Sequence, residues 1–259
     1  MTEVAAPMQP RLRRLETLWR GHVFLFDKPP GLPTYGSAAG VRLLLLVAGL
    51  ELVHLAFSHD TLLAGVNAYA LLGIPLPPFW FQAPILLALA LLSVRFVAGL
   101  QWPEIGLHRF GEWNATETSY FIQVVFVAGV VFPMMFAHRL RMVFAQSSAA
   151  SILWTTFVPY MFWGFHQEVL YRGMLQTELV RRWGAVVGII VANALYTFGP
   201  QHFYYFFSAR SLAASQFASI YAIGLVFAMV FRRSGNLWLV GVMHAIGNSI
   251  IAGTFGAIR

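Results

Sequence analysis

The chain contains no cysteine, which excludes a thiol nucleophile, disulfide bridges and thiolate ligands for a metal. It also lacks the GxSxG turn that presents a nucleophilic serine and the HExxH sequence that places two zinc-binding histidines on one helix. Serine hydrolases of that type, cysteine peptidases and HExxH zinc peptidases are therefore not indicated.

Charged residues are also scarce. They make up 10% of the chain, against 58% hydrophobic residues, whereas a soluble domain has roughly 25% and 45–50%. Such a chain cannot cover a soluble core with a charged surface, and its apolar residues are gathered into long runs typical of membrane helices. The net charge of +7 comes mainly from basic residues at the ends of these runs, which indicates membrane topology rather than a nucleic-acid partner.

Apolar stretches long enough to cross a bilayer recur along the chain. About 20 apolar residues are needed for each crossing, and the stretches lie near 40–57, 79–100, 119–137, 151–178, 184–202, 211–231 and 236–256. A shorter stretch at 62–76 ends in the run PLPP at 75–78, and we interpret it as re-entrant or interfacial. The sequence therefore predicts an all-α polytopic bundle of about seven transmembrane helices with a polar intramembrane cavity.

The first residues carry no secretory signal, because they are rich in arginine and proline and have no apolar core before a cleavage site. We expect a cytoplasmic segment at 1–39, N-terminal transmembrane helices at 40–150 and a core of further helices at 151–256. With a cytoplasmic N-terminus, twelve basic residues lie at the inner side and four outside. The outer ones, which oppose the rule, are Arg139, Arg141, Arg210 and Arg259.

Charged and polar residues inside predicted spans are costly and are candidates for function. They fall into four groups: Glu51 with His54; His166, Gln167 and Glu168 with Arg172; His202; and His244 with Asn248. Each group has a structural alternative. Glu51 and His54 share a helix face and either line a cavity or form a polar clasp, and His202, just after Gly199-Pro200, could be a capping residue.

Two of the groups hold residues four apart, which project from one helix face. Glu168 and Arg172 form either a buried ion pair that lets the helix cross without net charge or part of a site. His244 and Asn248 form either a clasp between helices or part of the same site. His166 lies about 200° round the helix from Glu168 and is not expected to join it.

Taken together, a carboxylate, two histidines and an asparagine on three separate spans suit a hydrolase. A carboxylate and a histidine can activate water, while a histidine and an asparagine can stabilise an oxyanion. The two histidines and the carboxylate could hold a metal, but their spacing does not demand one, and we expect no cofactor.

The order of these motifs resembles the CAAX protease and bacteriocin-processing family, also called the Abi family, of intramembrane endopeptidases. Its pattern is Glu-Glu-x-x-x-Arg, then Phe-x-x-x-His, then His-x-x-x-Asn or Asp, each on its own helix. In this chain the three motifs run from Gln167 to Arg172, from Phe198 to His202 and from His244 to Asn248, so the resemblance covers roughly residues 150–255.

The resemblance implies a helical bundle with a polar cavity and endopeptidase activity on a membrane-associated or lipid-anchored protein or peptide. The composition is typical of a bacterial protein, so we expect it in a bacterial inner membrane. It implies that Glu168 and His202 activate water and that His244 and Asn248 form the oxyanion site. Arg172 would hold Glu168 in place. The resemblance gives no oligomeric state and no substrate sequence.

One position departs from the family pattern. Gln167 stands where the family has its first glutamate, and a neutral amide cannot accept a proton from water. Either Glu168 takes that role, or the chain is a catalytically inactive relative that acts as a membrane binding or scaffold protein. A small transporter is a third interpretation, since buried Glu and His also relay protons, but the two halves show no repeat.

Overall fold

The computed structural model describes residues 35–57, 68–75, 78–202, 206, 211 and 213–257, and every regular element within them is helical. The longer helices are α2 (Ser37–Phe57), α4 (Phe79–Ser93), α5 (Ala115–Met135), α6 (Ala137–Gln146), α8 (Val158–Glu168), α9 (Thr177–Phe198), α11 (Ala213–Ser234) and α12 (Leu237–Ala257). The short elements are α3 (Ala68–Leu72), α7 (Ala149–Ile152), the π segments η1 (Val94–Ala98), η4 (Leu153–Phe157) and η5 (Val169–Gln176), and the 3-10 turns η2 (Trp102–Ile105), η3 (Phe110–Glu112) and η6 (Pro200–His202).

The predicted helical membrane bundle is confirmed. Among the described residues, five helices are long and apolar enough to cross a membrane, and α12 adds a shorter apolar stretch, Leu237–Ile251. One of the five runs for 50 residues, Ala149–Phe198. Gly184 interrupts it with a φ of 78°, outside the helical region. The bend falls where the sequence predicts one span to end and the next to begin, so the apolar elements amount to seven helices.

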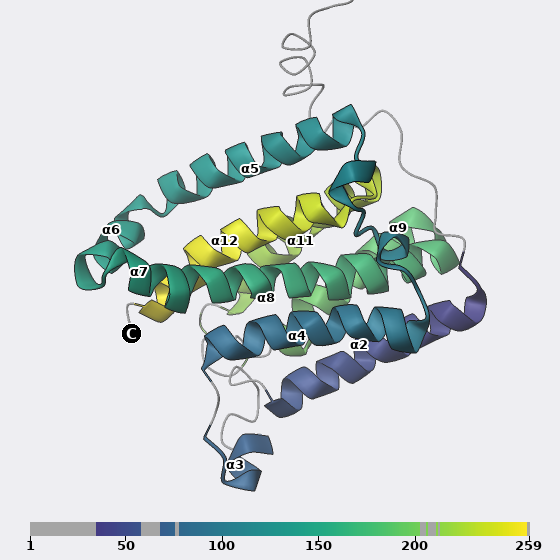
Figure 1. The fold of residues 1–259 in the computed structure, drawn as a ribbon, viewed down its shortest axis with the longest axis horizontal. Coiled ribbons are helices and arrows are strands. Elements are labelled where there is room, and N and C mark those ends of the chain that lie inside the picture. The colour runs from purple at the N-terminus through teal and green to yellow at the C-terminus, as the bar shows by residue number, and fades with distance from the viewer. Residues whose placement is uncertain are drawn as a thin grey trace, which may run out of the picture.

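Helix α8 lies in the middle of the bundle, with α4 packed on one side and α12 on the other (Figure 1). Helix α5 covers the far side of α12. After the bend at Gly184, α9 packs against η5 and α11, while α2 contacts η1, η5 and η6. The candidate motifs on α8, η6 and α12 therefore sit on elements that pack around one interior.

The π segment η5 follows Glu168 directly and is buried over its whole length. A π segment inserts a wider turn into an α-helix, and such insertions are common at functional sites. Its polar side chains reach two neighbouring helices: Tyr171 reaches α2, whereas Arg172 and Gln176 reach α11. This segment therefore ties the central helix to the helices around it.

Two predictions fall wholly or partly outside the described residues. The segment 1–39 is described only from residue 35 onward, and the short stretch 62–76 only at residues 68–75. Within 68–75 the helix α3 has five residues, too few to cross a bilayer. The interpretation of 62–76 as a re-entrant or interfacial piece stays a prediction.

Candidate active site

Glu168 is the centre of a buried polar cluster. It is the last residue of α8 and is fully buried. Its Oε1 lies 3.1 Å from Nη1 of Arg172 and 2.6 Å from Nδ1 of His244. One carboxylate oxygen thus faces a guanidinium from the next turn of its own helical run and an imidazole from α12.

Arg172 is held by more than this ion pair. Its Nη2 donates to the carbonyl oxygen of Gly224 at 2.9 Å and to Oδ1 of Asn193 at 3.4 Å. Its Cζ lies 4.3 Å from the centre of the Tyr196 ring, a cation–π distance. The Arg172 charge is therefore balanced inside the bundle, where a buried charge without partners would be very costly.

His244 presents its two ring nitrogens to different partners. An ionised carboxylate can only accept, so with Glu168 ionised beside Arg172 the 2.6 Å contact has Nδ1 of His244 as the donor. On the other edge of the ring, Nε2 lies 3.4 Å from the hydroxyl oxygen of Tyr196. With Nδ1 protonated, Nε2 of the neutral imidazole is an acceptor.

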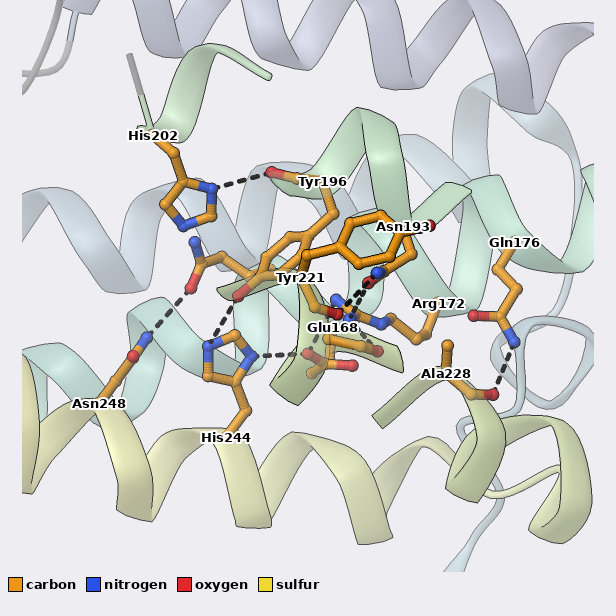
Figure 2. Close-up of polar contacts among 12 residues, drawn as sticks. Glu168, Arg172, Gln176, Asn193, Tyr196, His202, Tyr221, Ala228, His244 and Asn248 are labelled. Carbon is orange, nitrogen blue, oxygen red and sulfur yellow. Dashed lines mark hydrogen bonds and ion pairs between the residues drawn. The ribbon is translucent and has the colours of Figure 1, made fainter. Parts of the chain in front are cut away.

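His202 reaches the same neighbourhood through a sharp end to α9. The helix ends at Phe198, Gly199 is extended, and the turn η6 is closed by a 3.0 Å bond from the His202 amide to the carbonyl oxygen of Gly199. The His202 Nδ1 lies 2.8 Å from the Tyr196 carbonyl oxygen, and the two rings meet edge to face with centres 4.9 Å apart. Figure 2 shows Tyr196 between His202 and His244.

Asn248 lies one turn beyond His244 on α12. Its Nδ2 donates to Oε1 of Gln167 at 3.0 Å. Asn248 and His202 are half-buried, whereas Gln167, Glu168 and His244 are buried. The cluster is therefore most accessible on the side of Asn248 and His202.

The predicted site residues thus meet through three links. Glu168, Arg172 and His244 are in direct contact, Gln167 contacts Asn248, and His202 joins them through Tyr196. His166 is outside the cluster, as predicted from its helix face: it stacks on Trp163 at 5.3 Å, and His54 lies against the same indole at 5.1 Å.

Three residues in this network do not figure in the sequence motifs: Asn193, Tyr196 and Gly224. Asn193 and Tyr196 are three apart in the mainly apolar part of α9 that follows Gly184, so a search for buried polar pairs could have found them. Gly224 has no such signal. A Cβ there would clash with the Asn193 amide oxygen and lie 3.1 Å from Nη2 of Arg172, so glycine is needed for this close approach.

No group of three or more His, Cys, Asp or Glu side chains is placed to hold a metal ion in the described part of the chain. Glu168 and His244 form a group of only two, and Arg172 beside them adds a positive charge.

Residues 149–250 match the model of a protein family described as type II CAAX prenyl endopeptidase Rce1-like. This match confirms the resemblance that the three motifs indicate. It spans α7 to most of α12 and includes every member of the cluster, while Glu51 and His54 lie outside it. No curated protein and no solved structure matches the chain.

Proposed function

We propose that this integral membrane protein is an intramembrane endopeptidase, because residues 149–250 match the model of the type II CAAX prenyl endopeptidase Rce1-like family. Its substrate is a membrane-associated or lipid-anchored protein or peptide. The observation that carries the proposal is the 2.6 Å contact between Glu168 and His244, buried among apolar helices with Asn248 and His202 nearby. A carboxylate that orients a histidine is a recurrent arrangement for general-base catalysis.

We assign the general base to Nε2 of His244. Glu168 already accepts the His244 proton on Oε1 and pairs with Arg172 on the same oxygen, so it orients the imidazole. The Glu168 and Arg172 charges cancel, and a neutral His244 keeps the buried cluster neutral, which its apolar surroundings favour. The family resemblance implies an oxyanion role for His244, but the Nδ1 contact with Glu168 leaves an acceptor on Nε2 and supports the base role.

His202 and Asn248 complete the site. The carbonyl of Tyr196 fixes the proton of His202 on Nδ1, so its Nε2 presents an acceptor that can orient the attacking water. Asn248 Nδ2 carries two hydrogens and donates one to Gln167, so the second can donate to an oxyanion. Both residues lie on the accessible side of the cluster.

The reaction is a hydrolysis in two steps. Water attacks the carbonyl carbon of the scissile peptide, and its proton passes to Nε2 of His244 as the new C–O bond forms. The resulting oxyanion is stabilised by the Asn248 amide. The tetrahedral intermediate then collapses with cleavage of the C–N bond, and His244 returns the proton to the leaving amine.

We further propose that the N-terminus is cytoplasmic in a bacterial inner membrane. Twelve of the seventeen Lys and Arg residues support this orientation. Figure 1 places the start of α2 at one end of the bundle and α6, which carries Arg139 and Arg141, at the other. A reporter fused to each terminus, whose activity depends on the side of the membrane, tests this orientation. Periplasmic activity at the N-terminus would overturn it.

The activity is tested with purified protein in lipid vesicles and a farnesylated peptide that ends in Cys-a-a-X. Terminal peptides from wild-type and deletion strains supply candidate natural substrates. We expect cleavage by the wild type, none by E168A, H244A or H202A, and strongly reduced cleavage by N248A. Full cleavage by E168A would overturn the assignment of the site.

A non-catalytic relative is the second candidate, and the pairing of Gln167 with Asn248 favours it. In that case the amide pair would be a helix clasp and the polar cluster a binding surface. This function predicts that a membrane partner co-purifies with the chain, that E168A retains the partner, and that no peptide is cleaved by the wild type. Cleavage by the wild type that is lost in E168A would exclude it.

A further inference from the structure

Glu51 lies on α2, outside the matched family region, yet its carboxylate is buried and contacts the neighbourhood of the site. Its Oε1 accepts a hydrogen bond from the Tyr171 hydroxyl at 2.8 Å and another from Nε2 of Gln201 at 2.6 Å. These donors are 120 and 150 residues away in the sequence. The Oε1 atom of Glu51 on α2 thus bonds to two segments, η5 and η6, that are far from α2 in the sequence.

The two donors are direct chain neighbours of site residues. Tyr171 precedes Arg172 in η5, and Gln201 precedes His202 in η6. The turn also packs closely against Tyr171: a Cβ added at Gly199 would lie 3.1 Å from the Tyr171 hydroxyl oxygen. The Glu51 carboxylate therefore bridges the segment that holds Arg172 and the turn that holds His202.

Within the described residues, the turn contacts α9 and α2. It follows the end of α9 and is closed by the backbone hydrogen bond from His202 to Gly199, while the His202 ring meets the Tyr196 carbonyl oxygen at 2.8 Å. The side-chain bond from Gln201 to Glu51 ties the same turn to α2. Gln201 is buried and its Oε1 has no hydrogen-bond partner, so its bond to Glu51 is its described side-chain anchor.

We propose that Glu51 is a positioning residue for the active site, which acts through Gln201 and Tyr171 to hold the His202 imidazole relative to Arg172 and Glu168. Its catalytic consequence rests on the proposed peptidase function, while the positional effect on the turn does not. A misplacement of about 1 Å in such a group can lower a rate about 100-fold. A carboxylate that acts here only as a hydrogen-bond acceptor can be replaced in part by an amide oxygen.

A simple helix clasp is the alternative for Glu51. A clasp would stabilise the bundle as a whole, and its loss would lower the amount of folded protein and leave the turnover of each folded molecule unchanged. A positioning role instead lowers kcat of the folded molecules and affects KM little, since the Michaelis complex still forms but reacts slowly.

The test compares E51A, E51Q and the control L43A. Leu43 is buried on the same helix, about 12 Å along it from Glu51, so L43A loosens α2 without removing a contact of the turn. Two sets of quantities are measured on folded protein in vesicles. The first is deuterium uptake at 199–202, where Gly199, Gln201 and His202 carry backbone amide hydrogens and Pro200 has none. The second is kcat and KM for the farnesylated Cys-a-a-X peptide.

For E51A we expect faster exchange at 199–202 and a fall in kcat of about 10- to 100-fold with KM changed less than about threefold. E51Q should restore most of the slow exchange at 199–202 and most of kcat. L43A should leave the exchange at 199–202 and kcat unchanged. Unchanged exchange at 199–202 in E51A, or equal effects of E51A and L43A there, would overturn the inference. If the wild type cleaves nothing but E51A still alters exchange at 199–202, the peptidase proposal fails and the positional role of Glu51 stands.

Discussion

Nδ1 of His244 lies 2.6 Å from Oε1 of Glu168, although the two residues are 76 positions apart. This contact joins α8 to α12, which pack along each other through the middle of the bundle. With Glu168 ionised and the imidazole neutral, this contact places the His244 proton on Nδ1 and leaves Nε2 as an acceptor. The geometry of one pair of residues therefore sets the chemistry that the site can perform.

The charge of Glu168 should matter more than its shape. E168Q keeps an acceptor for His244 but loses the negative charge that fixes the tautomer and balances Arg172. We expect kcat for the farnesylated peptide to fall roughly 100-fold or more. E178Q is the matched control, because Glu178 is also buried but pairs with Arg181 and Arg182 near the Gly184 bend. If E178Q and E168Q lose activity equally at equal folded content, the charge of Glu168 has no special role.

Gln167 should act through Asn248 and not as a base. Q167A removes the acceptor for the Asn248 amide, and we expect a loss of only about tenfold in kcat. Q167E keeps an acceptor but brings a second carboxylate next to Glu168, so we expect it not to exceed the wild type. A gain of activity in Q167E from an inactive wild type would show a peptidase scaffold whose base has been lost.

Asn248 should contribute mainly to the transition state. N248A removes the proposed oxyanion donor, and we expect kcat to fall about 100-fold with little change in KM. S249A is a suitable neighbour control, because the buried Ser249 hydroxyl donates to the carbonyl oxygen of Ile246 in its own helix. A rise in KM at constant kcat in N248A would instead assign Asn248 to substrate binding.

Hydropathy predicts most of the fold, because each crossing of the hydrocarbon region needs a run of about 20 apolar residues. The bend at Gly184 follows the charged residues Arg181 and Arg182, which mark a membrane boundary in the sequence. The π geometry of η5 is not evident from the sequence. Its residues, Val169–Gln176, are compatible with an α-helix as well.

The site is predictable only as a set of residues. Residues four apart on one helix must share a face, so the pairing of Glu168 with Arg172 follows from spacing. The contact of Glu168 with His244 depends on how α12 is rotated about its own axis and how near it lies, and the sequence states neither. The links made by Tyr196 and Glu51 are likewise contacts between distant segments, without a local signal.

Gly164 sets the spacing on which the Glu168–His244 contact depends. It lies one turn before Glu168 on α8, and a Cβ there would lie 2.9 Å from the backbone of His244 and Ala245 on α12. Backbone atoms cannot rotate away as a side chain would, so G164A should push the two helices apart. We expect a loss of about 1–3 kcal/mol in stability and a fall in kcat larger than the loss of folded protein explains, since the Glu168–His244 distance grows.

The control is G129A on α5, where a Cβ meets nothing within 4 Å and alanine favours the helix. Thermal unfolding followed by the fluorescence of the eight tryptophans, with cleavage measured on the same samples, separates the two effects. Normal kcat in folded G164A would mean that the helices need not be this close for catalysis.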